Sequence, residues 1–575
     1  MYSKLFFLIA LNVFSIKLVS QSWQWTKSID GPNVSEGTGV TSDLSGNVIV
    51  TGNYAVSATI GTTSYTSSGS SDFYISKYDP LGNLLWSRSY GGVNWDKSQA
   101  ITCDQNGNIY ITGRFLSPNI TIGSISLNNP GWTDIFLIKF DSNGNPIWAK
   151  YVVGGEGMSL KTDNFGGVYI TGDYGGGFTP TFGTTTLPFL GASEAFITKY
   201  DSNGNVLWAQ SVNGPGNEHG RSVDIATNGN VYWTGSFESA SVNIGGITLT
   251  HTISTFTTHD IFVAKFDPSG TVLWANKIIG SDNDLPHSIS VDLSENAYIT
   301  GEFASSTLTI GSTVLTKIGT YDYFIVKYDT NGNPVWAKSS SSGTNTNCMG
   351  YSVSTDTSGN LHVVGGFAGT QISFGSYTLL NTFGPTYDPM FIVKYDSNGN
   401  ELCASLTPSG GHFVFSYVGV TGLCVNSDLF GNAYVTSRFA NSPFIVGNDT
   451  LHITGIHNAF VTKFSCDTIS PPNPSTLPCS NFNDIQIPNT FTPNNDGNND
   501  VFYLENWDLC AESYKLTIYN RWGVKIFESE NPNIEWDGRI SSGSEATDGT
   551  YFYIFDIKNK NGQNERITGF IALLR

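Results

Sequence analysis

Acidic, histidine and aromatic side chains gather in four segments that separate hydrophobic runs of this sequence. The segments are Gly91–Lys97, Gly214–Arg221, Gly280–His287 and Ser409–Tyr417. A carboxylate beside an imidazole can exchange protons with a substrate, and the same groups beside an aromatic ring can bind a sugar. The candidate ligand-binding residues are Trp95, Glu218, His219, Asp282, Asp284, His287, His412 and Phe413.

Both catalysis and simple binding are open to these residues. Glu156, Glu218–His219 and Asp282–His287 can supply the acid/base groups of a hydrolase or lyase that acts on polysaccharide. No nucleophile elbow, zinc motif or phosphate-binding loop accompanies them in the sequence. The residue pattern therefore favours binding without catalysis; an ordinary surface that binds no ligand is the alternative.

A candidate calcium site lies near the C-terminus. Asn494, Asp496, Asn498 and Asp500 place side-chain oxygens at alternate positions around Gly497, as calcium-binding loops do. The segment lacks the glutamate that closes such a loop with two oxygens, so a metal-free, hydrogen-bonded loop is the alternative. The sequence predicts no other cofactor.

The segments with candidate residues are connected by a repeated pattern of predicted strands. Asp134–Lys150 (DIFLIKFDSNGNPIWAK) is typical of two strands around a tight turn, capped by Asp and with Gly in the left-handed conformation. A partner motif, clearest at Asp104–Phe115 (DQNGNIYITGRF), predicts a second hairpin. The pair repeats about every 60–70 residues, which predicts four-stranded blades and hence a β-propeller.

Each copy of the first motif carries a lysine two residues before the turn aspartate. Nine residues after the lysine comes a tryptophan, except in the sixth copy, which has Cys403. We expect the lysine stems to pack and their amines to reach a nearby Asp; a polyanion-binding ring is the alternative. The lysines are Lys77, Lys139, Lys199, Lys265, Lys327, Lys394 and, in a seventh, shorter copy, Lys463.

The seventh copy, Ala459–Ser465, ends before its tryptophan, whereas the N-terminal segment Trp23–Ser28 is a lone strand with Trp25 at the tryptophan position. One missing strand and one spare strand predict that the N-terminal strand completes the last blade, which removes an exposed edge. The fold predicted for residues 21–466 is therefore all-β, a seven-bladed β-propeller closed by its N-terminal strand.

Residues 1–20 are predicted to be a signal peptide. Lys4 precedes the apolar run Leu5–Phe14, and a cleavage site fits near Ser20. The run is too short to span a membrane, and we expect no transmembrane segment elsewhere. A formal charge of −19 without a basic cluster argues against nucleic acid as a partner. The expected location is secreted or on the outer cell surface.

The composition changes after the repeats. Residues 467–483 are rich in proline and predict a stiff linker, and residues 484–575 contain enough strand patterns for a small Ig-like β-sandwich. In an exported protein Cys479 and Cys510 are predicted to form a disulfide that ties the linker to this domain. Cys466 is the main alternative partner of Cys479.

Five motifs in this last domain resemble the gliding-motility-associated C-terminal domain, the type B sorting signal of the type IX secretion system. The motifs are Ile487–Phe502, Ile518–Ser529, Trp536–Gly538, Asp548–Ile557 and Gly569–Arg575. The resemblance implies the type IX machinery as a partner and export across the outer membrane, followed by release or attachment. The propeller repeats are similar to the SBBP repeat family, which implies no defined activity.

Together these features predict an exported, non-catalytic propeller that binds a surface glycan or protein. A secreted polysaccharide hydrolase or lyase and a structural component of a gliding surface layer are the alternatives. We expect the variable loops that carry the candidate residues to form the binding face, because function tends to lie on variable loops over a rigid scaffold.

Overall fold

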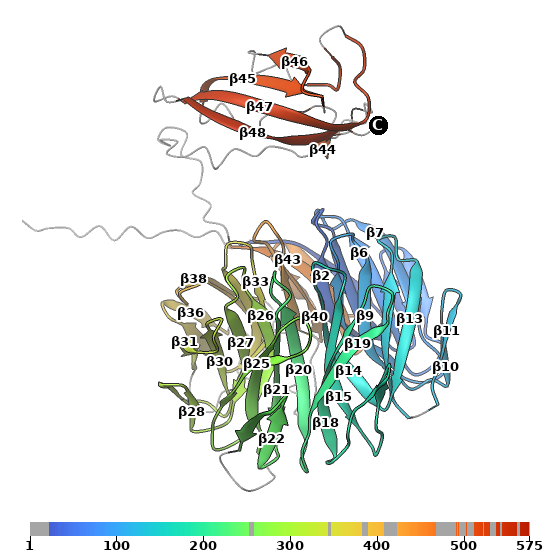
Figure 1. The fold of residues 1–575 in the computed structure, drawn as a ribbon, viewed down its shortest axis with the longest axis vertical. Coiled ribbons are helices and arrows are strands. Elements are labelled where there is room, and N and C mark those ends of the chain that lie inside the picture. The colour runs from blue at the N-terminus through green and yellow to red at the C-terminus, as the bar shows by residue number, and fades with distance from the viewer. Residues whose placement is uncertain are drawn as a thin grey trace, which may run out of the picture. The chain divides into compact units, whose positions relative to one another are not determined.

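The computed structural model of the 575-residue chain separates into two compact units, Met1–Ile469 and Ser470–Arg575 (Figure 1). It describes residues 22–130, 132–251, 258–342, 347–381, 389–407, 423–440 and 442–466 of the first unit. In the second unit it describes residues 490–491, 493, 502, 511–520, 522–529, 536–540, 543–559 and 564–573. Every regular element in these ranges is a β-strand. These ranges also contain no apolar helix of membrane-spanning length.

The first unit is built from small antiparallel sheets, and its fold is propeller-like. In the described residues six sheets have four strands, and a further six-stranded sheet begins with the same four-strand arrangement. The first three sheets contain β2 (Ser35–Ser42), β3 (Val48–Tyr54), β6 (Asp72–Tyr78) and β7 (Leu84–Tyr90); β8 (Asp96–Cys103), β9 (Ile109–Phe115), β12 (Asp134–Phe140) and β13 (Pro146–Val153); and β14 (Gly155–Thr162), β15 (Val168–Gly175), β18 (Ser193–Tyr200) and β19 (Val206–Val212).

The later sheets repeat this order. They contain β20 (Glu218–Ile225), β21 (Val231–Phe237), β24 (Asp260–Phe266) and β25 (Val272–Ile278); β26 (Asp284–Val291), β27 (Ala297–Phe303), β30 (Asp322–Tyr328) and β31 (Pro334–Ser339); β33 (Asn347–Thr355), β34 (Leu361–Ala368), β37 (Met390–Tyr395) and β38 (Glu401–Leu406); and β39 (Cys424–Ser427), β40 (Ala433–Phe439), β43 (Asn458–Ser465) and β1 (Ser22–Asp30).

Short hairpins lie in the connections between the second and third strands. They are β4 (Ser57–Ile60) and β5 (Thr63–Thr66), which extend the β1 sheet; β10 (Asn119–Ile122) and β11 (Ile125–Asn128); β16 (Thr181–Phe182) and β17 (Thr185–Thr186); β22 (Ser241–Ile244) and β23 (Ile247–Thr250); β28 (Thr307–Ile310) and β29 (Thr313–Thr316); β35 (Gln371–Phe374) and β36 (Tyr377–Leu380), joined by β32 (Ser341–Ser342); and β41 (Phe444–Val446) and β42 (Asp449–Leu451).

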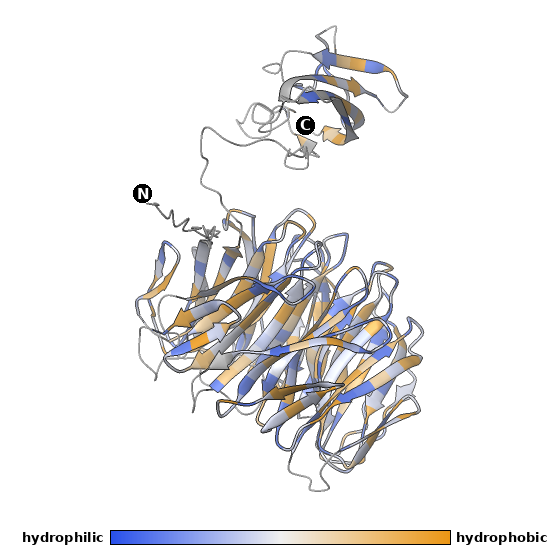
Figure 2. Cartoon of the chain, turned by 90° about the vertical axis from the view of Figure 1, so that its left-hand side faces the viewer, coloured by the Kyte–Doolittle hydropathy of each residue, from blue (hydrophilic) through white to orange (hydrophobic). Residues whose placement is uncertain are grey.

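The sheets pack face to face, and the hydrophobic core lies between them. Hydrophobic residues recur along the strands (Figure 2). One buried cluster, for example, joins Tyr169 and Ile197 of the third sheet to Trp233 and Phe262 of the fourth. The first strands contact one another in the order β2, β8, β14, β20, β26, β33 and β39, and β39 contacts β2 again.

The turns have the chemistry expected from their sequence. Asp141 accepts hydrogen bonds from the backbone N–H of Asn143 and Asn145 at 2.9 and 2.8 Å, and Gly144 has a φ of +77°. A side chain at a residue with this φ would be strained, which is why glycine is favoured there. The Asp caps of the D-x-N-G-N turns are therefore confirmed.

The predicted N-terminal strand is β1, and it pairs antiparallel with β43. Trp25 lies opposite Lys463 in this ladder and is only 8% exposed. Its indole N–H donates to the carbonyl oxygen of Pro80 in the turn of the first sheet, at 3.0 Å. Trp148 donates in the same way to Ser202 in the next sheet, at 3.1 Å. Trp25 thus has the contact that its place in the repeat predicts.

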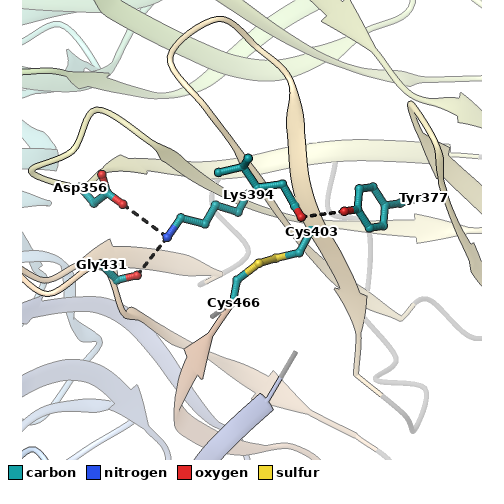
Figure 3. The surroundings of a disulfide bond; sticks show 7 residues. Asp356, Tyr377, Lys394, Cys403, Gly431 and Cys466 are labelled. Atoms are coloured by element: carbon teal, nitrogen blue, oxygen red, sulfur yellow. Dashed lines mark hydrogen bonds and ion pairs between the residues drawn. A yellow bond between two sulfur atoms is a disulfide. The ribbon is translucent and has the colours of Figure 1, made fainter. Parts of the chain in front are cut away.

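A disulfide joins Cys403 to Cys466 (Figure 3). Cys403 lies in β38 at the tryptophan position of the sixth repeat, and Cys466 directly follows β43. Because Cys466 is bonded here, it is not the partner of Cys479. The predicted pair Cys479–Cys510 itself lies outside the described residues.

In the second unit a five-stranded sheet has the order β44 (Thr490–Phe491), β48 (Asn564–Leu573), β47 (Gly549–Asn559), β45 (Ala511–Tyr519) and β46 (Lys525–Ser529). Phe491, Phe502, Trp536 and Phe555 are among the residues of its buried core. The Ig-like sandwich stays a prediction. The candidate calcium residues Asn494, Asp496, Asn498 and Asp500 lie outside the described residues, as do the predicted signal peptide and the linker.

Replacing Trp25 should destabilise the first unit. Trp25→Ala removes a buried indole and its bond to Pro80, and we expect a loss of about 3 kcal/mol or more in the free energy of unfolding. Trp132→Ala is the control: that side chain is 82% exposed, so its loss should change stability by less than about 0.5 kcal/mol. Equal melting temperatures for the two variants would contradict a stabilising role for β1.

Candidate functional site

The candidate residues fall into three groups by exposure. Trp95 and Asp282 are exposed, His219 and His287 are half-buried, and Glu218 and Asp284 are fully buried. His412 and Phe413 lie outside the described residues. The structure therefore separates the side chains that can meet a ligand from those that hold the loops.

Glu218 and Asp284 bind the loop that follows the second strand of their own sheets. Asp284 accepts hydrogen bonds from the backbone N–H of Ser305 at 3.2 Å and from its hydroxyl at 2.7 Å. Glu218 accepts the same two bonds from Ser239, at 3.2 and 2.6 Å. Burial raises the pKa of each carboxyl group to about 7, and the nearby charge of Glu194 adds to this effect at Glu218. Their position makes them anchors of the loops rather than surface ligands.

A set of acidic, basic and histidine side chains lies at one end of the first and second strands of the sheets, and we call it the charged belt. Its members are Glu36, Lys97, Arg114, Glu156, Asp173, His219, His287, Glu302 and Arg438. They lie near the starts of the first strands and the ends of the second strands. Four of its ion pairs link neighbouring sheets, and the fifth lies within one sheet. The belt thus places acidic and basic groups side by side along adjoining sheets.

Opposite charges are matched within the belt. Glu36 lies 3.1 Å from the ammonium of Lys97 and 3.2 Å from the guanidinium of Arg438. Burial alone would raise the pKa of Glu36, but these two cations hold it below its ordinary value. Arg114 pairs with Glu156 at 2.8 Å.

Both half-buried candidate histidines belong to the belt and face a carboxylate. His219 Nδ1 lies 2.8 Å from Asp173, and His287 Nε2 lies 3.3 Å from Glu302. The ring of His259 is 5.8 Å from that of His219, and burial lowers its pKa to about 4. His259 is therefore neutral at neutral pH, whereas His219 and His287 each lie beside a carboxylate that can orient the ring.

A cavity of about 160 Å³ lies among the first strands of all seven sheets, and we call it the central channel. Six of these strands carry a β-bulge at the same level, where one residue has no partner in the neighbouring strand. The bulge residues are Thr38, Gln99, Met158, Arg221, His287 and Tyr351, and all of them line the channel.

Serine hydroxyls accept hydrogen bonds from backbone N–H groups at the edge of the channel. The N–H of Val223 donates to Ser159 of the preceding sheet at 3.4 Å, and that of Ile289 donates to Ser222 at 3.2 Å. Ser288 and Ser352 accept equivalent bonds from the next sheets, at 3.2 Å each. Because these N–H groups are already bonded, recognition in the channel depends on side chains.

The repeated lysines do not line the channel. Lys199 lies 4.8 Å from the ring centre of Tyr169 and 3.2 Å from Asp163, and Lys77 lies 2.8 Å from Asp43. Figure 3 shows the same arrangement for Lys394, which reaches Asp356 at 3.4 Å. The interpretation that their stems pack and their amines reach an acid is confirmed for these three lysines.

Most of the belt was missed by sequence reasoning, which followed the loops. One sequence feature could have indicated the belt: the residue after Thr-Gly in the partner motif is charged in some repeats and uncharged in others. It is Arg114 in the second repeat, Asp173 in the third and Glu302 in the fifth, but Asn53 in the first. Such variation inside an otherwise regular strand indicates a position that the fold does not fix.

A family model for the CHU_C type IX secretion signal domain matches residues 485–573. An uncharacterized WD repeat-containing protein, L264, of Acanthamoeba polyphaga mimivirus is 27% identical over 67% of this chain and 34% of its own length. The regulatory protein FlaEY of Caulobacter vibrioides is 26% identical over 54% of this chain and 33% of its own length. The chain thus spans about a third of the length of these two relatives.

Among solved structures, PorZ matches with a TM-score of 0.22 and 9% identity, over 94% of this chain and 81% of that one. PorZ is described as an essential bacterial surface component of the type-IX secretion system of Porphyromonas gingivalis. The family match makes the C-terminal region a type IX secretion signal, which implies export to the cell surface or beyond.

The buried carboxyl of Asp284 should make stability depend on pH. Its pKa of about 7 exceeds the value of about 3.9 in an unfolded chain. Between these values the folded protein holds a proton that the unfolded chain has released. Its contribution is therefore complete below about pH 4 and is lost as the pH rises through about 7.

Asp284→Asn should flatten the pH dependence of the free energy of unfolding between about pH 4 and 7, as measured by denaturant titration. It should not abolish the slope, because the carboxyl of Glu218 remains. Asp282→Asn, at an exposed neighbour, is the control and should keep the original slope. An unchanged slope in Asp284→Asn would refute the buried, protonated state.

Proposed function

We propose that this protein is a type IX secretion cargo whose propeller binds a glycan at the cell surface or outside the cell. In this proposal residues 1–20 are the signal peptide, 21–466 a seven-bladed β-propeller, 467–483 the linker and 484–575 the sorting domain. The secretion signal at 485–573 is the observation that carries export. A calcium loop around Asp496 and a Cys479–Cys510 disulfide belong to the same proposal.

The strand contacts support a closed ring of seven blades. The first strands follow one another around the central channel, and the seventh contacts the first. β1 supplies the fourth strand of the last sheet, the place that β13 has in the second sheet. Such closure leaves each blade face covered by its neighbours, which gives a rigid scaffold for variable loops.

Glycan binding is supported by the charged belt together with the exposed ring of Trp95. Trp95 is 52% exposed, and its ring centre lies 5.6 Å from the ammonium of Lys97, which belongs to the belt. An exposed aromatic face next to charged hydrogen-bonding groups suits stacking against a sugar and recognition of its hydroxyls. A surface protein is the alternative partner.

One observation favours a second function, a polysaccharide hydrolase or lyase. The His219–Asp173 pair, with 2.8 Å between its atoms, has the geometry of a base held by a carboxylate. A glycan-array screen with product analysis separates the functions. Retention without products supports binding, new products support catalysis, and neither result favours a structural component of the surface layer.

Export should depend on the sorting domain. We expect a chain lacking residues 481–575 to cross the inner membrane and then to remain in the periplasm as a folded propeller, because it has lost the type IX signal. Immunoblots of periplasm, cell surface and medium measure this. The full chain is the control, and truncated protein in the medium or on the surface would contradict the proposal.

The glycan should contact the loops and not the D-x-N-G-N turns. Trp95→Ala should weaken binding of a glycan found in the array screen by about tenfold, since stacking against an aromatic contributes on the order of 1 kcal/mol. Asn145→Ala, on the turn face, removes only a local bond to Asp141 and should leave affinity unchanged. Weaker binding by the second variant alone would invert the assignment of the faces.

A further inference from the structure

Two strong cations line the central channel, Lys161 and Arg221. Lys161 pairs with Asp224 at 3.5 Å, whereas Arg221 stands at the bulge of β20. Within the described residues its guanidinium takes part in no ion pair, and its Nε is buried without a hydrogen-bond partner. The Nε atoms of Arg114 and Arg438 are also buried without a hydrogen-bond partner, but each of these two arginines pairs with a glutamate, and Arg221 does not. Arg221 therefore offers an unmatched positive charge to whatever enters the channel.

The carboxylates around the channel do not neutralise this charge. Glu36 already pairs with Lys97 and Arg438, and Glu156 pairs with Arg114. Asp173 pairs with His219, and Glu302 faces His287. An anion that enters would find Arg221 free to form two parallel hydrogen bonds, the geometry that suits a carboxylate.

The size of the channel limits what can reach Arg221. Its volume of about 160 Å³ is smaller than the roughly 300 Å³ at which pockets enclose whole ligands. The channel therefore accommodates one terminal group of a larger molecule. Thr38, Gln99 and Tyr351 line it at the same level with uncharged polar side chains, which are hydrogen-bonded to Ser98, Glu156 and Met349.

We infer that the central channel binds the carboxylate of an acidic sugar residue, a uronate, through Arg221. The inference rests on the proposed glycan-binding function and names the chemistry of the glycan. In this arrangement the uronate enters the channel, and the rest of the glycan lies outside it.

A peptide C-terminus carries the same carboxylate but fits this site less well. Proteins capture peptide C-termini mainly with runs of free backbone N–H groups. At this channel edge the N–H groups of Val223, Ile289 and Val353 are already bonded to serine hydroxyls. The side-chain cation then remains as the anion-binding group, which favours a sugar acid.

The test is calorimetric titration of the purified full chain with trigalacturonate and with its methyl ester, which keeps the rings but removes the charge. Since a hydrogen bond to a charged group contributes about 1.5–3 kcal/mol, the acid should bind at least about tenfold more tightly than the ester. Arg221→Met should abolish this preference, and Arg221→Lys should keep only part of it. Arg88→Met, which removes an arginine from β7, should leave it intact.

The outcomes are separable from those of the proposed function. Equal affinity of the wild type for acid and ester, or a full preference in a folded Arg221→Met, would overturn the uronate inference. If neutral glycans still bind, the glycan function stands. The uronate inference would also be overturned, in favour of a peptide ligand, if a peptide bound only with a free C-terminus and its binding required Arg221. Thermal melting shows whether each variant is folded, and Arg221→Lys replaces Arg221→Met if the latter is not.

Discussion

The fold of the first unit depends on one small contact that is repeated from sheet to sheet. A lysine of the third strand and a tryptophan of the fourth strand donate hydrogen bonds to a single carbonyl in the turn of the next sheet. Lys139 and Trp148 both reach Ser202, at 3.2 and 3.1 Å. The contact joins neighbouring sheets through a turn carbonyl, and it therefore needs no strand pairing between them.

The junction between the sixth and seventh sheets shows why this contact matters. Cys403 replaces the donor tryptophan, and Cys466 stands at the position of the accepting residue, equivalent to Ser202. The disulfide between them therefore takes the place of the missing hydrogen bond. A cross-link over 63 residues stabilises by about 4 kcal/mol in the loop-entropy model. It also fixes the end of β43, the strand to which β1 pairs.

The repeated elements could be predicted from the sequence. The contacts of the residues near the central channel could not. The turn aspartates, the lysine contacts and the pairing partner of Trp25 follow from local spacing, because each recurs in several copies. Glu218 and Asp284 were chosen as ligand residues because they precede strands in variable loops. Their burial depends on hydroxyls about 21 residues later in the chain, Ser239 and Ser305. The Cys403–Cys466 bond also joins two neighbouring sheets across 63 residues of sequence, which no local spacing indicates.

The same division between regular and irregular positions explains how a repeated scaffold can carry one specific site. Positions that join neighbouring sheets must keep their residue type, since each copy needs the same partner. A bulge residue has no strand partner, so its side chain is free to differ: Thr38, Met158 and Arg221 occupy the same position in three sheets. The packing of the sheets places these unlike side chains around one cavity. Variation between copies is therefore greatest at the bulges, where the repeat is least regular, and Arg221 is the only one of the six bulge residues that is an arginine or a lysine.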